Sequence, residues 1–159
     1  MRPAGRRRIR FESASARNGT AAIEFGLLAP LLIILLTGIV ELGLGTYQAM
    51  QAQAAAEAGA LYASIHGSGN LTAISSAVTS ATGTSGITAS PAPVVFCGCP
   101  TTTGITSQGS NCSTACSNGN APGTYVTVSA TITRWELLTP YINLGLPTTF
   151  TGSSTVRVQ

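Results

Sequence analysis

The hydrophobic pattern of the chain is dominated by one apolar stretch near the N-terminus. From Phe25 to Val40 no residue is charged, and the apolar character continues as far as Tyr47. As a helix, the segment from Phe25 to Tyr47 would be about 34 Å long, which is enough to cross a hydrocarbon core of roughly 30 Å. The pattern therefore predicts one transmembrane helix.

The helical pattern does not stop where the apolar stretch ends. Residues 48–65 are rich in alanine and other strong helix formers, and Gly67-Ser68-Gly69 supplies both a break and a glycine for a left-handed cap. We expect one helix from Thr20 to about Ile65. A second, short amphipathic helix is predicted over residues 70–81, where Leu71, Ile74 and Val78 recur at helical spacing.

The rest of the chain has the period-two alternation and the turn residues of a small sheet. Strands are predicted over Ile87–Phe96, an edge strand because it contains two prolines, over the strictly alternating Tyr125–Thr133, and over Ser153–Val158. A turn is predicted at 82–86, a loop rich in Cys, Gly, Ser and Asn at 97–123, and an apolar loop at 136–149.

Charge is distributed unevenly about the apolar stretch. The first 18 residues carry a net charge of +5 and the remainder −2, which together give the +3 of the whole chain. The basic residues before the stretch are all arginines: Arg2, Arg6, Arg7, Arg8, Arg10 and Arg17. Arginines beside a first span predict that the N-terminus stays in the cytoplasm and that the C-terminal part is exported.

Other interpretations of the basic N-terminus are weaker. The tail offers one aromatic residue, Phe11, and no recognition helix, so orientation and attraction to anionic lipid are favoured over nucleic-acid binding. Ala52-Gln53-Ala54 has the form of a signal-peptidase site. It lies 12 residues after Val40 with Glu41 between, which is far for a cleavable signal.

An acidic residue stands at the start of the apolar stretch, within Gly19-Thr20-Ala21-Ala22-Ile23-Glu24-Phe25. A carboxylate at the mouth of a transmembrane helix is costly and is a candidate for function. Together with Ala29-Pro30, Gly38-Ile39-Val40-Glu41, Ala55-Ala56, Gly59-Ala60 and Tyr62-Ala63, this segment resembles the TadE-like proteins. These are small pseudopilins of the tight-adherence (Tad, type IVc, Flp-type) pilus machinery. Glu57 and Leu61 stand where the family often has arginines, which puts charge contacts of that turn in doubt.

The resemblance implies a precursor that a prepilin peptidase cuts between Gly19 and Thr20. Glu24 would then be the fifth residue of the mature chain, before Phe25, and could neutralise the new Thr20 amine in its own chain or in a neighbouring subunit. The second charge of the apolar segment, Glu41, is expected at the outer headgroup boundary. The implied partners are membrane lipid, other pilins and pseudopilins, the Tad inner-membrane assembly proteins and the peptidase.

The expected fold is α+β. A long N-terminal transmembrane helix continues into an exported helix and is followed by a small antiparallel β-sheet domain with a short helix, the layout of pilin-like proteins. The expected parts are a basic cytoplasmic leader (1–19), a TadE-like transmembrane and extended helix (20–66), and an exported, disulfide-linked, β-rich domain (67–159). The expected location is the bacterial inner membrane, as a single-pass protein whose C-terminal domain is periplasmic or extracellular, in or beside the pilus.

Small residues follow the second part of the long helix at small-x-x-x-small spacing. They are Ala52, Ala55, Ala56, Gly59 and Ala60. Such surfaces allow close approach of helix backbones, and a solvated single helix would normally carry more charge. We expect these residues to pack against the helices of other subunits; the alternative is a plain alanine-rich helix without a partner.

Four cysteines lie in the exported part: Cys97, Cys99, Cys112 and Cys116. An oxidising compartment favours disulfides over a four-thiolate zinc site, and the spacing departs from the usual zinc pattern. A bond between Cys97 and Cys99 would close a very small ring. The two cross-pairings, Cys97–Cys116 with Cys99–Cys112 or Cys97–Cys112 with Cys99–Cys116, remain open.

The sequence offers no credible catalytic set. It has one histidine, His66, and contains no lysine, no aspartate and no G-x-S-x-G elbow. We therefore expect a protein that is not an enzyme and that uses no cofactor, metal, nucleic acid or small-molecule substrate. The alternative to a pilus component is an uncleaved, signal-anchored exported domain that binds a surface ligand.

Overall fold

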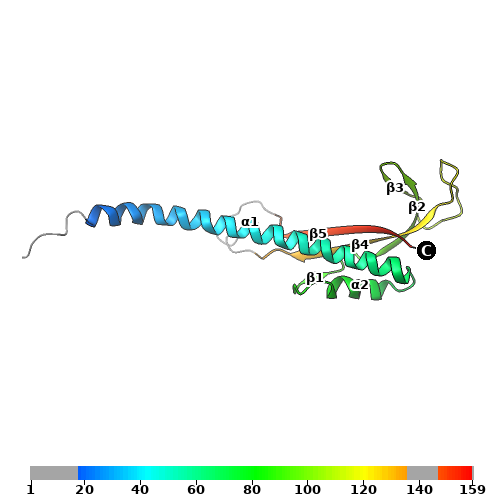
Figure 1. The fold of residues 1–159 in the computed structure, drawn as a ribbon, viewed down its shortest axis with the longest axis horizontal. Helices are drawn as coiled ribbons and strands as arrows, with labels where there is room; N and C mark the ends of the chain where they lie inside the picture. The colour runs from blue at the N-terminus through cyan, green and yellow to red at the C-terminus, as the bar shows by residue number, and fades with distance from the viewer. Residues whose placement is uncertain (1–17, 136–146, 159) are drawn as a thin grey trace, which may run out of the picture. The chain divides into compact units, whose positions relative to one another are not determined.

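The computed structural model describes residues 18–135 and 147–158 (Figure 1). Two compact units are present, residues 1–39 and residues 40–159. The predicted basic leader falls almost wholly on residues 1–17, and most of the predicted apolar loop falls on residues 136–146. Both of these ranges lie outside the described residues.

The first unit contains the beginning of helix α1, Asn18–His66. Its large apolar side chains from Ile23 to Ile39 are exposed on all sides of the helix, as expected for a segment surrounded by lipid. By length and composition, the helix can cross a membrane. The predicted long apolar N-terminal helix is thus confirmed, with bounds that differ from the prediction by one or two residues.

In the second unit, one face of α1 is buried. The buried positions are Glu41, Gly45, Ala52, Ala55, Ala56, Gly59, Ala60 and Ala63, which recur three or four residues apart and so lie along one side of the helix. Helix α2, Leu71–Ser80, follows, and the Ala73 N–H donates to the Asn70 side chain across 2.9 Å at its start. An N-terminal Asn cap of this kind satisfies a backbone donor that the helix leaves unpaired.

The sheet is antiparallel and is organised around β4, Gly123–Thr133. One edge of β4 pairs along its length with β5, Thr149–Val158. The other edge pairs with β1, Ile87–Thr88, and with β2, Val94–Thr101. Strand β3, Gly104–Ser107, pairs with the outer edge of β2. The predicted α+β class and its pilin-like layout are confirmed.

Three parts of the strand prediction need correction. The predicted strand Ile87–Phe96 is broken into β1 and β2, because the segment between them contains Pro91 and Pro93, which cannot donate to a ladder. The predicted loop 97–123 begins inside β2 and contains β3. At the other end, β5 starts at Thr149 rather than Ser153, since its pairing with β4 extends to Thr133↔Thr149.

The core lies between the helices and one face of the sheet. Alternate residues of β4, namely Val126, Val128, Ala130 and Ile132, share one buried cluster with Ile74 and Val78 of α2 and the alanines of α1. Because successive strand residues point to opposite faces, α1 and α2 cover the same face. In Figure 1, β5 runs alongside both β4 and the second part of α1.

Candidate functional site

The small-residue face of α1 is covered by the protein's own domain. Ala52, Ala55 and Ala56 have no exposed surface, and Ala60 is 4% exposed. They belong to the same buried cluster as the β4 and α2 side chains. The predicted packing of these residues against other subunits' helices is therefore replaced by packing within the chain, since the sheet and α2 occupy that face.

Gly59 shows how closely α1 approaches its neighbours. A Cβ at this position would lie 2.5 Å from Val78 Cγ2 of α2 and 2.8 Å from Val128 Cγ1 of β4. Both distances are too short for carbon atoms in contact, which pack at about 3.5–4.0 Å. Glycine at 59 therefore lets α2 and β4 both rest against α1.

Gly152 of β5 makes the closest approach between the sheet and α1. A Cβ here would lie 2.5 Å from both Cα and N of Gln53 and 2.6 Å from the carbonyl carbon of Ala52. Because these are backbone atoms, a side chain at 152 could not be accommodated by a rotamer change. A glycine inside a strand often marks such a close backbone approach.

The Gln53 side chain of α1 holds β5 in place through hydrogen bonds. Its Oε1 accepts from the Ser153 N–H across 3.2 Å, and its Nε2 donates to the Ser153 carbonyl across 3.3 Å. Nε2 also donates to Glu57 Oε1 at 3.0 Å. One glutamine thus satisfies both backbone groups of a residue in a sheet edge strand, where such groups otherwise have no ladder partner.

Glu41 lies in a buried ion pair. Arg134 Nη2 donates to Glu41 Oε1 across 2.8 Å, and the two side chains are 3% and 2% exposed. Arg134 directly follows β4, and its backbone N–H donates to the Thr148 carbonyl at 2.8 Å, which extends the β4–β5 ladder. Glu41 therefore holds a partner from its own chain, which the sequence did not predict.

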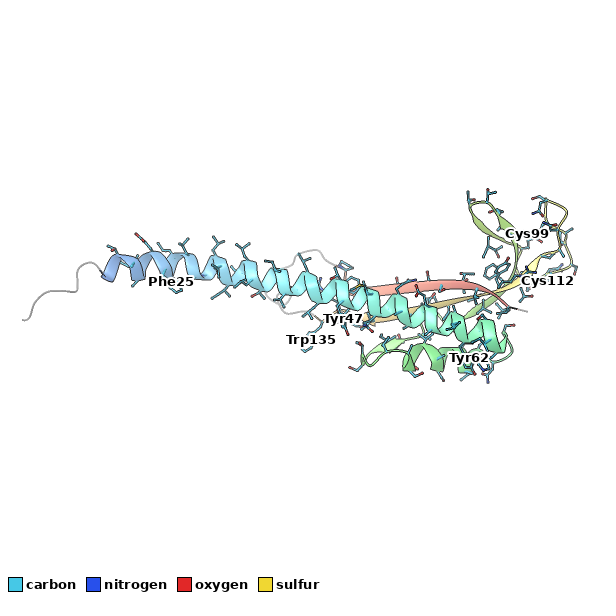
Figure 2. The ribbon with its side chains drawn as sticks, in the orientation of Figure 1. Phe25, Tyr47, Tyr62, Cys99, Cys112 and Trp135 are labelled. Carbon is cyan, nitrogen blue, oxygen red and sulfur yellow. A yellow bond between two sulfur atoms is a disulfide. The ribbon has the colours of Figure 1, made fainter. Side chains whose placement is uncertain are left out.

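The residues of the predicted processing motif are exposed. Gly19, Thr20, Glu24 and Phe25 all lie on the first part of α1, with Phe25 74% exposed (Figure 2). A Cβ added to Gly19 would meet nothing within 4 Å. The fold itself therefore places no steric demand for glycine at position 19.

The cysteines form two disulfides, Cys97–Cys112 and Cys99–Cys116; Cys99 and Cys112, one cysteine of each, are labelled in Figure 2. This is one of the two predicted cross-pairings. The bridges tie the chain after β3 back to β2.

A hollow of about 650 Å³ lies beside the second bridge. It is lined by Cys99, Pro100, Thr101, Thr102, Thr106, Gln108, Cys116, Ser117 and Asn118. None of these residues is an acid or a base. In residues 18–135 and 147–158, no group of three or more His, Cys, Asp or Glu side chains could hold a metal ion.

Comparison with known proteins places the helical segment in a family. Residues 19–61 match the family model described as TadE-like protein. No curated protein and no solved structure matches the chain. The matched range begins at the glycine of the predicted processing motif and ends within the alanine-rich part of α1, so it covers the residues on which the resemblance rested except Tyr62-Ala63. The match supports an association with the Tad pilus and with the membrane. Residues 19–61 of this chain are therefore a TadE-like segment.

Proposed function

We propose that this protein is a pseudopilin, a structural component of a Tad (type IVc, Flp-type) pilus. In this proposal it is made as a precursor, cut by a prepilin peptidase between Gly19 and Thr20, and assembled through its N-terminal helix. Its role is structural rather than catalytic. The observation that carries the proposal is the contrast between the two parts of α1.

The large apolar side chains of the first part of α1 are exposed, whereas the small side chains of its second part are buried against the chain's own sheet and α2. Large apolar side chains from Ile23 to Ile39 are exposed, but Ala52, Ala55 and Ala56 are fully buried in the domain. In a bilayer the open surface contacts acyl chains, and outside a bilayer an apolar surface of this size must be covered by other protein. The lateral contacts of an assembled subunit therefore fall within residues 20–40.

Gly19 and Glu24 support the processing and docking steps. Gly19 has no neighbour that a Cβ would meet, so a requirement for glycine there would come from an enzyme that must approach the backbone closely. Glu24 is an exposed carboxylate in an apolar helix. Such a charge is costly in a membrane unless it is paired, and the amine of a mature Thr20 is a suitable partner.

The arginines and the bridges support the proposed orientation. The six arginines that precede the apolar helix favour a cytoplasmic N-terminus. The two disulfides support a domain on the other side of the inner membrane, because such bonds persist in oxidising compartments. The proposed partners are membrane lipid, other pilins and pseudopilins, Tad inner-membrane assembly proteins and the prepilin peptidase.

The mature N-terminus tests the proposal. The full chain is expressed with and without its cognate prepilin peptidase, extracted from membranes, and examined by intact mass and N-terminal sequencing. The expected mature chain begins at Thr20 only when the peptidase is present. A chain that still begins at Met1 would favour an uncleaved, signal-anchored exported binding domain, and one cut after Ala54 would favour an ordinary secreted protein.

A further inference from the structure

The single tryptophan of the chain lies exposed on the folded unit. Trp135 directly follows the paired Arg134, and its side chain is 69% exposed. Its backbone N–H donates to Gln48 Oε1 across 3.4 Å, which places it beside α1. A tryptophan left largely uncovered gives up the stabilisation that its large apolar surface gains on burial.

Other large apolar side chains are exposed on α1 at and just before the level of Gln48, on different sides of the helix. Leu42, Leu44 and Tyr47 are on the part of α1 that enters the folded unit, and Tyr47 is 49% exposed. Figure 2 shows Tyr47 and Trp135 at this same end of the unit. We call these four residues the entry surface. The nearby charges of Glu41 and Arg134 are buried against each other, and α1 carries no further charge until Glu57.

The length of α1 relates the entry surface to the thickness of a membrane. Tyr47 follows Gly19 by 28 residues, or about 42 Å of helix, and a bilayer with its headgroups is about 40–45 Å thick. Glu41 follows Gly19 by 22 residues, or about 33 Å, which is near the far boundary of the hydrocarbon core when the near headgroup layer of about 5–7 Å is counted. With Gly19 at one membrane face, Tyr47 and its neighbour Gln48 therefore reach the opposite headgroup layer.

We propose that the entry surface is a lipid-binding surface, seated in the interfacial region of the outer leaflet, between the hydrocarbon boundary near Glu41 and the headgroups near Tyr47, with Trp135 as its anchor. Tryptophan and tyrosine are the side chains enriched in that region. The buried Glu41–Arg134 pair fits the same depth, because either charge alone would be costly there. The folded unit of the membrane-resident protein thus rests on the bilayer. This inference rests on the proposed anchoring role of α1.

Because Trp135 is the only tryptophan, its fluorescence reports the depth directly. The full-length protein is reconstituted in phosphatidylcholine vesicles that contain lipid brominated either near the glycerol end or near the end of the acyl chain. The expected result is an emission maximum shifted to the blue, a larger loss of intensity with the shallow bromines than with the deep ones, and little quenching by aqueous iodide. Full iodide quenching without an effect of either brominated lipid would overturn the inference.

Two matched variants in a Trp135→Phe background separate this inference from the anchor itself. Tyr47→Trp puts the probe on α1 at the same level and should show the same shallow quenching. Leu61→Trp puts it on an exposed position of the same helix, about 21 Å further along, and should be quenched by iodide only.

Flotation and the quenching of the three tryptophan probes together distinguish the membrane anchor from the lipid-binding surface. Failure of the protein to float with the vesicles would reject the anchor. Quenching of the Tyr47→Trp probe by shallow bromines without quenching of native Trp135 would reject the lipid-binding surface and leave the anchor standing. Equal lipid quenching of the Leu61→Trp probe would also reject it, because the unit would then lie along the membrane instead of resting on one end.

Discussion

Arg134 Nη2 and Glu41 Oε1 lie 2.8 Å apart, although 93 residues separate them in the chain. Their pair joins the end of the central strand to the point where α1 enters the folded unit. Both side chains are almost fully buried, so the pair is poorly screened by water. It fixes the sheet at one position along α1.

Removing one member of this pair should destabilise the protein strongly. Arg134→Met leaves a carboxylate buried, and Glu41→Leu leaves a guanidinium buried, each with an expected loss of about 3–5 kcal/mol. The double variant should lose much less than the sum, because neither charge remains. Urea unfolding of the full chain in detergent measures these free energies. Arg157→Met, at an exposed position of β5, should stay within about 0.5 kcal/mol; additive losses in the double variant would contradict the pairing.

Gly152 should not accept even one methyl group. Gly152→Ala places a Cβ against the α1 backbone at Gln53, so the strand or the helix must move, with an expected loss of about 1–3 kcal/mol or more. Gly83→Ala is the matched control, because nothing lies within 4 Å of its added Cβ. The comparison uses the urea midpoint of each variant, and an unchanged midpoint for Gly152→Ala would show that β5 does not cross α1 at this residue.

Thiol counting should separate the two cross-pairings of the cysteines. Cys97→Ser with Cys112→Ser removes one whole bridge and should leave no thiol that reacts with an alkylating reagent before reduction. Cys97→Ser with Cys116→Ser removes one partner of each bridge and should leave two reactive thiols. The opposite pattern would mean the other pairing. Each whole bridge closes a short loop, and its loss should lower the free energy of unfolding by about 2–4 kcal/mol.

Gly19 and Glu24 should give different phenotypes when they are changed. Gly19→Val should accumulate precursor, since a branched side chain keeps the peptidase from the backbone, whereas Gly19→Ala should be cut in part. Glu24→Ala should be cut normally and should accumulate mature protein that stays in the membrane without supporting pili. Immunoblots of membrane and pilus fractions measure both steps. Accumulation of precursor with Glu24→Ala would place that residue in processing instead of docking.

The elements with a local signal were predictable from the sequence. The apolar run and its alanine-rich continuation define α1, the spacing of Ile74 and Val78 defines α2, and strict alternation defines β4. In each case a few neighbouring residues carry the information. The same reasoning missed β3 and the end of β2, because the stretch Cys-Gly-Cys-Pro-Thr has no alternation and becomes a strand through its partners.

The features that depend on distant parts of the chain were not predictable in the same way. No local pattern relates Glu41 to Arg134. The small residues of α1 show that something approaches closely, but the same spacing serves a neighbouring helix or a sheet. Gly152 is the residue that indicates the sheet as the partner of α1, since a glycine within the strand that follows β4 is typical of a close backbone approach. Reading Gly59 and Gly152 together would have favoured the chain's own sheet as the partner.

The hydrogen bonds between Gln53 and Ser153 set an order for the formation of the domain. They join residues 100 apart, and contacts of such long range form slowly. In the proposed orientation, α1 would enter the membrane before β5 is exported, so Ala52, Ala55 and Ala56 would have no cover from the sheet at that stage. During that interval the small residues would be open to the helices of other copies. Once β5 has paired with β4, this face of α1 is covered within the chain and is closed to other copies.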